Sequence, residues 1–394
     1  MAVTTFLSPY DLAPILSGVI KGLEPQRPNW LQTFFGQPQY SERTRVNLDQ
    51  EFNVKNVMGQ FVAPNADATP IRLPEFGTKE LYFAYSKESI VSDDFDVLNT
   101  RQLGQDFGSV DPLANKAARL QKKMMLAEYR FENLFEKVSA DILLYGGYQA
   151  AGENHPIVRY DFGRTVIKTT TDLNNKKLIP SVNLTSTAVT APWDSTTTIL
   201  PVISGLSGRN WTKANVDAAT ATPVKDLIRI YETANARAGS AGILMSDDAY
   251  DIFSYDLQKN YLAASDTTII SILQVQQEIL PRVQEYRGLT YRRAYPLGNG
   301  QIINIYTYNA VYHDRLTGIE TAYIGSGWVL SIPPAVNGLK VYGRIMHPRA
   351  NWQAMPRWLN YWMEEKTGQE EWEYHCSFLM ATKDVDSCVA WKVI

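Results

Sequence analysis

Apolar and polar residues alternate along the segment from residue 45 to residue 95. The spacing of two is clear in "RVNLDQEFNV" and again in "KELYFAYSKESIV". Because successive side chains of a strand point to opposite faces, this pattern predicts two strands. Pro64, Pro70, Pro74 and Gly77 separate the two runs and predict a hairpin with a loose end. A hairpin of this length reaches roughly 80 Å when fully extended, so it needs a surface outside its own domain.

Between residues 111 and 147 the apolar spacing changes to three and four, which predicts one long helix. Asp111 is a suitable N-cap, and Pro112 fits the first turn, where the N–H that proline lacks is not needed. Gly146 and Gly147 favour the end of the helix. About 34 residues at 1.5 Å each give a length of about 51 Å. The predicted apolar stripe consists of Leu113, Ala117, Leu120, Met124, Ala127, Phe131, Leu134, Val138, Ile142 and Tyr145.

The charges along this helix are arranged against its macrodipole. The basic residues of its first half are Lys116, Arg119, Lys122 and Lys123, and the acidic residues of its second half are Glu128, Glu132, Glu136 and Asp141. Local stability favours the reverse order, and several like-charge pairs stand four residues apart. Either these charges interact with partners outside the helix, or their cost, a few tenths of a kcal/mol per pair, is tolerated.

The second half of the chain mixes helical and strand patterns. Residues 221–335 contain an amphipathic helix, the apolar strand "ILMS", a short helix opening at Ser246, a further helix in "TTIISILQVQQEIL" and several strands, which together predict a mixed α/β domain. Residues 336–394 return to strands around a tryptophan-rich segment. Residues 1–44 are predicted to form an arm, and the Thr- and Ser-rich residues 171–200 a surface loop or hairpin.

The overall composition excludes some classes of protein. The chain of 394 residues is long enough for two or three domains, and its formal net charge is −3. This balance argues against a dedicated nucleic-acid-binding protein, which carries a strongly basic face. The only cysteines, Cys376 and Cys388, predict neither a disulfide framework nor a zinc site. No signal peptide and no apolar run of about 20 residues is found, so we expect a cytoplasmic protein without a membrane span.

Candidate catalytic residues are few. The four histidines lack metal-ligand spacing. His375 and Cys376 suggest a thiol–imidazole pair, but adjacent residues of a strand point to opposite faces. The triplet "DFG" at residues 161–163 resembles a kinase metal-binding motif, but the other kinase motifs are missing, so a turn is predicted. The sequence therefore predicts no catalytic residue, no metal and no cofactor.

Two clusters near the C-terminus leave alternatives open. One contains the acidic residues Glu364, Glu365, Glu370, Glu371 and Glu373. It could bind a divalent cation, but a solvated loop is the favoured interpretation. The other places Arg344, Arg349 and Arg357 among tryptophans, a pattern found where bases stack on aromatic rings. At this overall charge we favour a packed interface between subunits.

The order of these parts resembles the Hong Kong 97-type fold of tailed-phage major capsid proteins, and more narrowly the lambda-type capsid protein E family. The resemblance rests on "LDQEFNVKNVMGQFVAPNADATPIRL" in the hairpin, on the helix "DPLANKAARLQKKMMLAEYRFENLFEKVSADILLYGG" and on "PIVRYDFGRT" after it. It also rests on "GILMSDDAYDIF" in the α/β domain and on the closing segment from "IMHPRANWQAMPRW" to "CVAWKV". It covers nearly the whole chain as an order of elements, and the family often ends on a more proline-rich tail.

The resemblance implies an α+β fold whose parts have defined places in a shell. These are an N-terminal arm (1–44), an extended loop (45–95), a peripheral domain (96–220) with a spine helix (111–147) and an insertion (171–200), an axial domain (221–335) and the return strands of the peripheral domain (336–394). The long helix is then a strut across a flat subunit, with its exposed charges facing neighbours or the lumen. The extended loop lies across a neighbouring subunit.

The resemblance also implies the partners. They are further copies of the chain in hexamers and pentamers, a separate scaffolding protein, a portal, a decoration protein and packaged double-stranded DNA, in a virion assembled in the bacterial cytoplasm. Contacts between subunits are expected at Phe61, Ile71, Arg72, Lys79, Arg349, Trp352, Trp358 and Trp362. Weak, non-specific contacts with DNA are expected at Lys116, Arg119, Lys122 and Lys123, because a strongly basic lumen would impede packing and release. A covalent crosslink through Lys79, which some capsid proteins of this fold make, is not expected.

Two other functions stay open at this point. An encapsulin-like bacterial compartment shares the fold and encloses protein cargo, and nucleic acid in purified particles distinguishes the two. An enzyme with a site in the α/β domain could use Asp247, Asp248 and Asp251. These aspartates also suit the N-terminal turn of a helix, which is the favoured interpretation.

Overall fold

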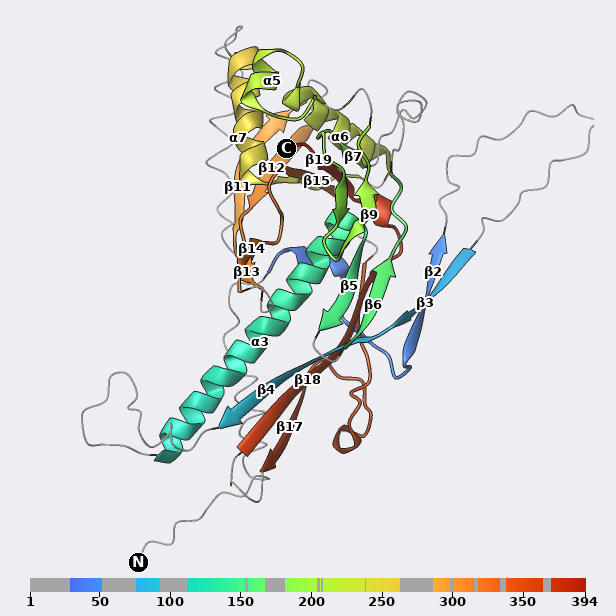
Figure 1. The fold of residues 1–394 in the computed structure, drawn as a ribbon, viewed down its shortest axis with the longest axis vertical. Coiled ribbons are helices and arrows are strands. Elements are labelled where there is room, and N and C mark those ends of the chain that lie inside the picture. Colours follow the sequence, from blue (N-terminus) through green and yellow to red (C-terminus); the bar gives the residue numbers. More distant parts are fainter. Residues whose placement is uncertain are drawn as a thin grey trace, which may run out of the picture.

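The computed structural model describes residues 29–51, 76–92, 112–152, 155–166, 181–203, 206, 208–237, 239–262, 286–297, 301–314, 318–333, 338–363 and 370–394. Two parts are evident in Figure 1. One is an α/β domain with a six-stranded sheet, and the other an elongated body in which one long helix runs beside long strands. No helix in these residues is both long enough and apolar enough to cross a membrane.

The long helix is α3, Pro112–Tyr145, with 34 residues. Gly146 ends it in a left-handed conformation with φ of 77°, and its N–H donates to the carbonyl of Ile142. The buried guanidinium of Arg164 then donates to the carbonyls of Leu143 and Leu144, both at 2.6 Å, and so satisfies the C-terminal end of the helix. The predicted helix and its glycine end are confirmed, while Asp111 lies outside the described residues.

A five-stranded sheet packs against α3. Its strands are β1 (Gln39–Tyr40), β4 (Ala84–Ser92), β16 (Gly338–Tyr342), β17 (Trp358–Met363) and β18 (Glu370–Thr382). The long strand β18 lies at its centre and pairs antiparallel with β16, β17 and β4. Phe135 of α3 is fully buried against it, with its ring centroid 4.8 Å from that of Phe378. The apolar side chains of the helix between Leu120 and Ile142 that face this sheet therefore form one core with it.

The predicted hairpin is confirmed at its base. Strand β2 (Arg45–Glu51) pairs antiparallel with β3 (Phe76–Tyr82), and β4 follows β3 after one residue. Leu48 and Leu81 are buried in the core that α3 forms with the sheet, whereas the ribbon leads away from the body in Figure 1. The tip of the hairpin, residues 52–75, lies outside the described residues.

The α/β domain contains a six-stranded sheet in the order β11-β12-β10-β15-β19-β7. In chain order these strands are β7 (Val182–Asn183), β10 (Gly242–Met245), β11 (Leu289–Pro296), β12 (Ile302–Tyr308), β15 (Trp328–Ile332) and β19 (Val389–Lys392). The helices are α5 (Lys213–Asp217), α6 (Pro223–Arg237) and α7 (Asp247–Asp256), which a π-type turn (Leu257–Leu262) extends. Ser246 is the N-cap of α7 as predicted, because its side chain accepts from Ala249 N–H. The predicted helix in "TTIISILQVQQEIL" lies outside the described residues.

Smaller elements complete the chain. They are the two-stranded ribbons β5–β6 (Gly147–Gly152, His155–Asp161), β8–β9 (Val189–Ala191, Asp194–Leu200) and β13–β14 (Val311–His313, Glu320–Ala322), and the 3-10 turns Leu31–Phe35, Pro348–Ala350 and Val385–Ser387. The triplet at residues 161–163 is a turn, as predicted, with Gly163 at φ of 73°.

Two strand pairings, β19 with β15 and β7 with β19, join residues that the sequence analysis assigned to different domains. The C-terminal strand β19, expected among the peripheral strands, pairs antiparallel with β15 of the α/β domain. Strand β7, within the expected insertion, pairs parallel with β19. Residues 182–183 and 389–392 thus complete the sheet of the α/β domain, so the chain passes between the two parts more often than the sequence suggested.

Candidate functional site

The acidic half of α3 faces a cation from the strand region. The Arg357 guanidinium contacts Glu128 through Nε at 3.0 Å and Glu132 through Nη2 at 3.3 Å. It also lies 4.8 Å from the centroid of the Phe131 ring and 4.9 Å from that of Phe135, within the range of a cation–π contact. Only 11% of the Arg357 side chain is exposed. One arginine therefore bridges two like charges that stand four residues apart.

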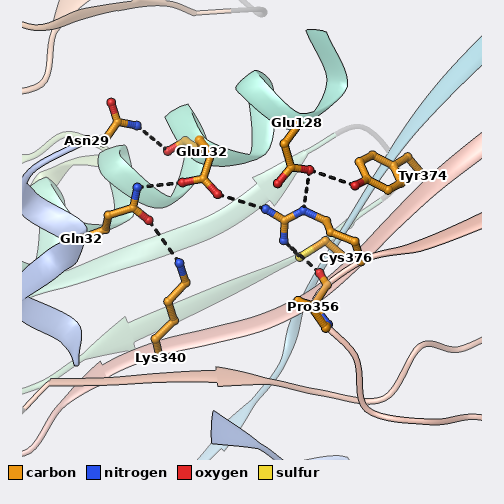
Figure 2. A network of polar contacts seen from close by, with 9 residues as sticks. Asn29, Gln32, Glu128, Glu132, Lys340, Pro356, Tyr374 and Cys376 are labelled. Atoms are coloured by element: carbon orange, nitrogen blue, oxygen red, sulfur yellow. Dashed lines mark hydrogen bonds and ion pairs between the residues drawn. The ribbon is translucent and has the colours of Figure 1, made fainter. Parts of the chain in front are cut away.

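Further hydrogen bonds extend this network toward the N-terminal segment (Figure 2). Gln32 donates through Nε2 to Glu132 Oε2 at 2.7 Å, and its Oε1 accepts from Lys340 Nζ at 3.1 Å. Asn29 donates to the backbone carbonyl of Glu132, and Tyr374 donates its hydroxyl to Glu128. The network thereby joins residues 29–35, α3, β16 and β18.

Glu136, one turn further along α3, is completely buried. Its carboxylate accepts from the backbone N–H groups of Leu31 at 2.9 Å and Gln32 at 3.1 Å, and from the hydroxyl of Tyr308 on β12. Burial raises the pKa of this carboxyl, and the hydrogen bonds from Tyr308 and the two amides oppose that rise. A single side chain thus holds the N-terminal segment, the long helix and the α/β domain together.

The last acidic residue of the helix, Asp141, pairs with Lys137 at 2.7 Å in the i, i+4 arrangement. Glu128, Glu132 and Glu136 thus have partners outside the helix, which supports the first interpretation of the charge pattern, whereas Asp141 pairs within the helix. The expectation that the exposed charges of the helix face neighbours or the lumen is wrong for its acidic half. Contacts of Glu128, Glu132 and Glu136 with other segments of the chain offset the cost of placing negative charges toward the C-terminal end of the helix.

The basic half of α3 is different. Lys122 and Lys123 are exposed, and the side chains of Lys116 and Arg119 lie outside the described residues. Contacts of these four residues with DNA stay a prediction.

The predicted subunit-contact residues lie in several places. Phe61, Ile71 and Arg72 lie outside the described residues. Lys79 Nζ donates to the backbone carbonyl of Asp161 at 2.9 Å. The exposed Arg349 donates to the carbonyl of Tyr361 at 3.0 Å, and Trp352 is 51% exposed. Trp358 and Trp362 are half-buried on β17.

Trp358 belongs to a cluster with two histidines. Its ring centroid is 4.6 Å from that of His347 and 5.0 Å from that of His375. His375 is fully buried and bonds Tyr85 through Nδ1 and Glu373 through Nε2. Burial lowers the pKa of His375 to about 4, although Glu373 opposes the shift. The imidazole is therefore neutral at pH 7.

The thiol–imidazole hypothesis for His375 and Cys376 is not supported. Cys376 Sγ accepts from the guanidinium of Arg357 at 3.3 Å, beside α3, while His375 contacts Tyr85 and Glu373. Burial raises the pKa of the Cys376 thiol to about 11, so a reactive thiolate is not formed at neutral pH. Cys376 and Cys388 are both buried and free.

Two of the three aspartates of the enzyme hypothesis, Asp247 and Asp248, have structural partners. Asp247 contacts Arg292 at 2.8 Å and Asn309, and Asp248 accepts from Ser326 at 2.6 Å, all around the start of α7. Within the described residues no three His, Cys, Asp or Glu side chains are grouped so that they could hold a metal ion. In the acidic cluster, Glu371 bonds Ser89 and Glu373 bonds His375, while Glu364 and Glu365 lie outside the described residues.

Sequence reasoning missed the partners of the helix. Gln32, Tyr308 and Lys340 belong to segments far from α3 in the chain, and nothing in their own sequence surroundings indicates a role. The one available signal was the reversed charge order of the helix, which showed that partners were needed but not where they were.

Comparison with known proteins gives a partial match to a family and a similar fold. Residues 208–393 match the phage major capsid protein E family. A search of curated proteins found no match. Among solved structures, a protein assigned as a prophage capsid protein of Escherichia coli CFT073 has a TM-score of 0.60 at 12% identity, covering 97% of this chain and 98% of that one. This similarity confirms the predicted Hong Kong 97-type fold.

Two weaker similarities involve assembled shells. The mature capsid of bacteriophage PhiM1 has a TM-score of 0.42 at 10% identity, covering 94% of this chain and 88% of that one. An encapsulin of Synechococcus elongatus PCC 7942 has a TM-score of 0.36 at 9% identity, covering 96% and 95%.

Replacing Arg357 by Met should leave Glu128 and Glu132 without their shared cation. We expect the free energy of unfolding to fall by about 2–4 kcal/mol, because a partly buried pair loses one partner. Urea unfolding followed by tryptophan fluorescence measures the loss. Arg349→Met is the matched control, because Arg349 is exposed and among the described residues bonds only a backbone carbonyl. This substitution should change the free energy of unfolding by under about 0.5 kcal/mol. Equal effects of the two substitutions would show that the contacts of Arg357 with Glu128 and Glu132 do not stabilise the fold.

The lowered pKa of His375 predicts a pH dependence of stability. Between about pH 6.5 and 4 the unfolded chain binds a proton that the folded chain excludes, so stability present above pH 6.5 is lost as the pH falls toward 4. In His375→Gln, the difference between the unfolding free energies measured at pH 7.5 and at pH 4.5 should be smaller than in the unsubstituted chain. His313→Gln, at an exposed histidine, should leave it unchanged. An unchanged loss in His375→Gln would show that other groups cause it.

Proposed function

We infer that the chain is the major capsid protein of a tailed bacteriophage, because residues 208–393 match the phage major capsid protein E family. A capsid protein acts by assembly, and the described residues agree with this. Their buried ionisable groups are used in packing, and their exposed features are extended strands and isolated apolar side chains.

We propose that copies of the chain associate as hexamers and pentamers and close into an icosahedral shell around double-stranded DNA. The observation that carries this proposal is the β2–β3 ribbon. Its base is fixed in the core by Leu48 and Leu81, while its strands lead away from the body. Such a ribbon has little of its own chain to pack on, so a neighbouring copy supplies the surface.

The parts of the chain receive their proposed places in the shell accordingly. Residues 1–44 form the arm, 45–95 the extended loop, 96–220 and 336–394 the peripheral part, and 221–335 the axial part. The pairing of β7 and β19 with the axial sheet modifies this division at residues 182–183 and 389–392. The contacts of residues 29–35 with α3 support an arm that is fixed to the spine at its base.

The remaining partners follow from the same function. A scaffolding protein, a portal and a decoration protein are proposed, with assembly in the bacterial cytoplasm. Lys79 is proposed to stay without a covalent crosslink, which its hydrogen bond to the Asp161 carbonyl supports. Catalysis is not part of the proposal. An encapsulin-like compartment is the second candidate. It would form the same kind of shell, so the shell alone does not distinguish it from a virion.

Negative-stain electron microscopy of the purified chain, with and without a co-expressed scaffolding protein, tests assembly. We expect closed shells, tubes or six-fold capsomers. A strictly monomeric protein under both conditions, with residues 45–95 protected from protease, would overturn the capsid function. Nucleic acid inside the particles is expected for a virion, whereas particles filled with protein cargo would favour the encapsulin-like compartment.

Weak contacts between the basic half of α3 and DNA predict a small effect of charge removal. Lys122→Ala with Lys123→Ala should reduce the retention of DNA in full particles modestly and make it less dependent on salt, because fewer counterions are released. The salt concentration at which DNA is lost on heating measures this. Lys213→Ala, on α5, is a control of equal side-chain chemistry. Unchanged packaged length and particle stability in the double variant would rule out a lumenal role.

A further inference from the structure

A cavity of about 350 Å³ lies where several segments of the α/β domain meet. They are β7, β19, the start of α6 and the segment before α5 (Figure 1). The volume is at the small end of the range for ligand pockets, roughly 300–1,000 Å³, so the cavity suits one small molecule. Its apolar wall consists of Val182, Leu184, Leu206 and Trp391.

The charged wall of the cavity contains one carboxylate and two guanidinium groups. The Asp226 side chain is 1% exposed, and one of its oxygens lies 3.4 Å from Arg209 Nη2 and 3.6 Å from Arg229 Nη1. Its other oxygen accepts from the Trp211 indole N–H at 3.3 Å. Hydrogen bonds between charged groups are typically about 2.7–2.9 Å long, so the arginines hold this carboxylate loosely. Burial raises the pKa of the Asp226 carboxyl, and its three partners oppose that rise only in part.

The two arginines have further hydrogen-bond donors at the cavity wall. A guanidinium donates from all of its nitrogens, and among the described residues the contact with Asp226 uses one nitrogen of each arginine. Two cations against one carboxylate leave the lining with a net charge of about +1. Asp256, a buried carboxylate nearby, is not among the described lining residues and accepts from the Val224 N–H and from Asn260. The cavity can therefore receive one further anion.

We propose that this cavity binds a small carboxylate that carries a short aliphatic tail. The carboxylate lies against the two guanidinium groups, whose planar donors match its shape, and the tail packs on the apolar wall. Asp226 is then a counter-ion built into the site: it holds the arginines in place and weakens ligand binding by repulsion. An inorganic phosphate would leave the apolar wall unused. The site lies within one chain, so it goes beyond the proposed shell function and does not depend on assembly.

Such a ligand contacts both strands at this edge of the sheet. Strand β7 has only two residues and pairs with β19 at Val182–Trp391 and Asn183–Lys392. The Leu184 N–H extends this pairing by donating to the Lys392 carbonyl at 2.9 Å. Val182, Leu184 and Trp391 all line the cavity, so the bound tail packs on both strands. Occupancy should therefore oppose local opening of this short edge.

Titration of the full chain with sodium hexanoate, followed by saturation-transfer NMR, tests the site. We expect saturable binding of hexanoate, binding of acetate that is weaker by about tenfold or more because it lacks the tail, and no competition by hexylammonium. Arg229→Gln should weaken hexanoate binding by about tenfold, as expected for the loss of a hydrogen bond between charged groups. Lys225→Gln, on the exposed face of the same helix, removes an equal charge and should change binding by less than about twofold. Asp226→Asn should strengthen it several-fold, because the repulsion is removed.

Several results would overturn the inference. Hexanoate that does not saturate, or that binds Arg229→Gln as tightly as the unsubstituted chain, would show that the arginines do not form the site. Acetate or phosphate that binds as tightly as hexanoate would rule out the apolar part of the ligand. The Arg229 side chain is 52% exposed, so its variant should fold, which thermal unfolding verifies, and it decides the question even when Asp226→Asn does not fold. None of these results bears on the capsid function, because binding is measured on the chain whether or not it assembles.

Hydrogen exchange followed by mass spectrometry locates the bound probe. At a hexanoate concentration of about ten times its Kd, the Leu184 amide should exchange roughly tenfold more slowly, because the ligand binds only the closed edge. The amide of Leu48, at the base of the β2–β3 ribbon, is the control and should exchange at an unchanged rate. Slower exchange elsewhere in the chain without slower exchange at Leu184 would place the probe outside this cavity and overturn the inference.

Discussion

The buried carboxylate of Glu136 is the constraint on which the arrangement of the chain depends. A carboxylate without exposure is costly unless its oxygens receive hydrogen bonds, and here the donors come from two other parts of the chain. The amides of Leu31 and Gln32 fix the start of the described chain on α3, and Tyr308 fixes β12 of the α/β domain on the same turn. Moving any of the three parts would leave a buried charge without its partners.

Arg357, which lies outside the helix, binds the two acidic residues of α3 that precede Glu136. Its two carboxylate contacts tie the irregular segment before β17 to α3, and its stacking on Phe131 and Phe135 places the charge over the aromatic core. Together the two sites make the helix a rigid strut with the strand body on one side and the α/β domain at one end. Packing of Phe135 against Phe378 supplies the apolar part of the same rigidity.

Features that depend on neighbouring residues could be predicted from the sequence. Features that depend on contacts between distant segments of the chain could not. The helix, its Gly146 end and the Ser246 cap are local patterns, and all were predicted correctly. The alternating run that begins at Lys79 was predicted as one strand, but it is divided between β3, which pairs with β2, and β4, which pairs with β18. The pairing of β19 with β15 was not predicted, because a four-residue apolar strand fits either sheet and only long-range packing selects one. The partners of Glu136 could not be predicted either, since a buried tyrosine and two backbone amides have no local signature. The reversed order of charges along α3 was the one sequence feature that suggested contacts of this kind.

The edges of the six-stranded sheet limit how copies of the chain can associate. Strand β7 has two residues, Val182 and Asn183, which is too short to template a long backbone pairing with another sheet. Association at this edge therefore has to use side chains, and side-chain recognition is specific in a way that backbone pairing is not. A sheet edge of two residues thus offers little backbone for unordered growth from sheet to sheet.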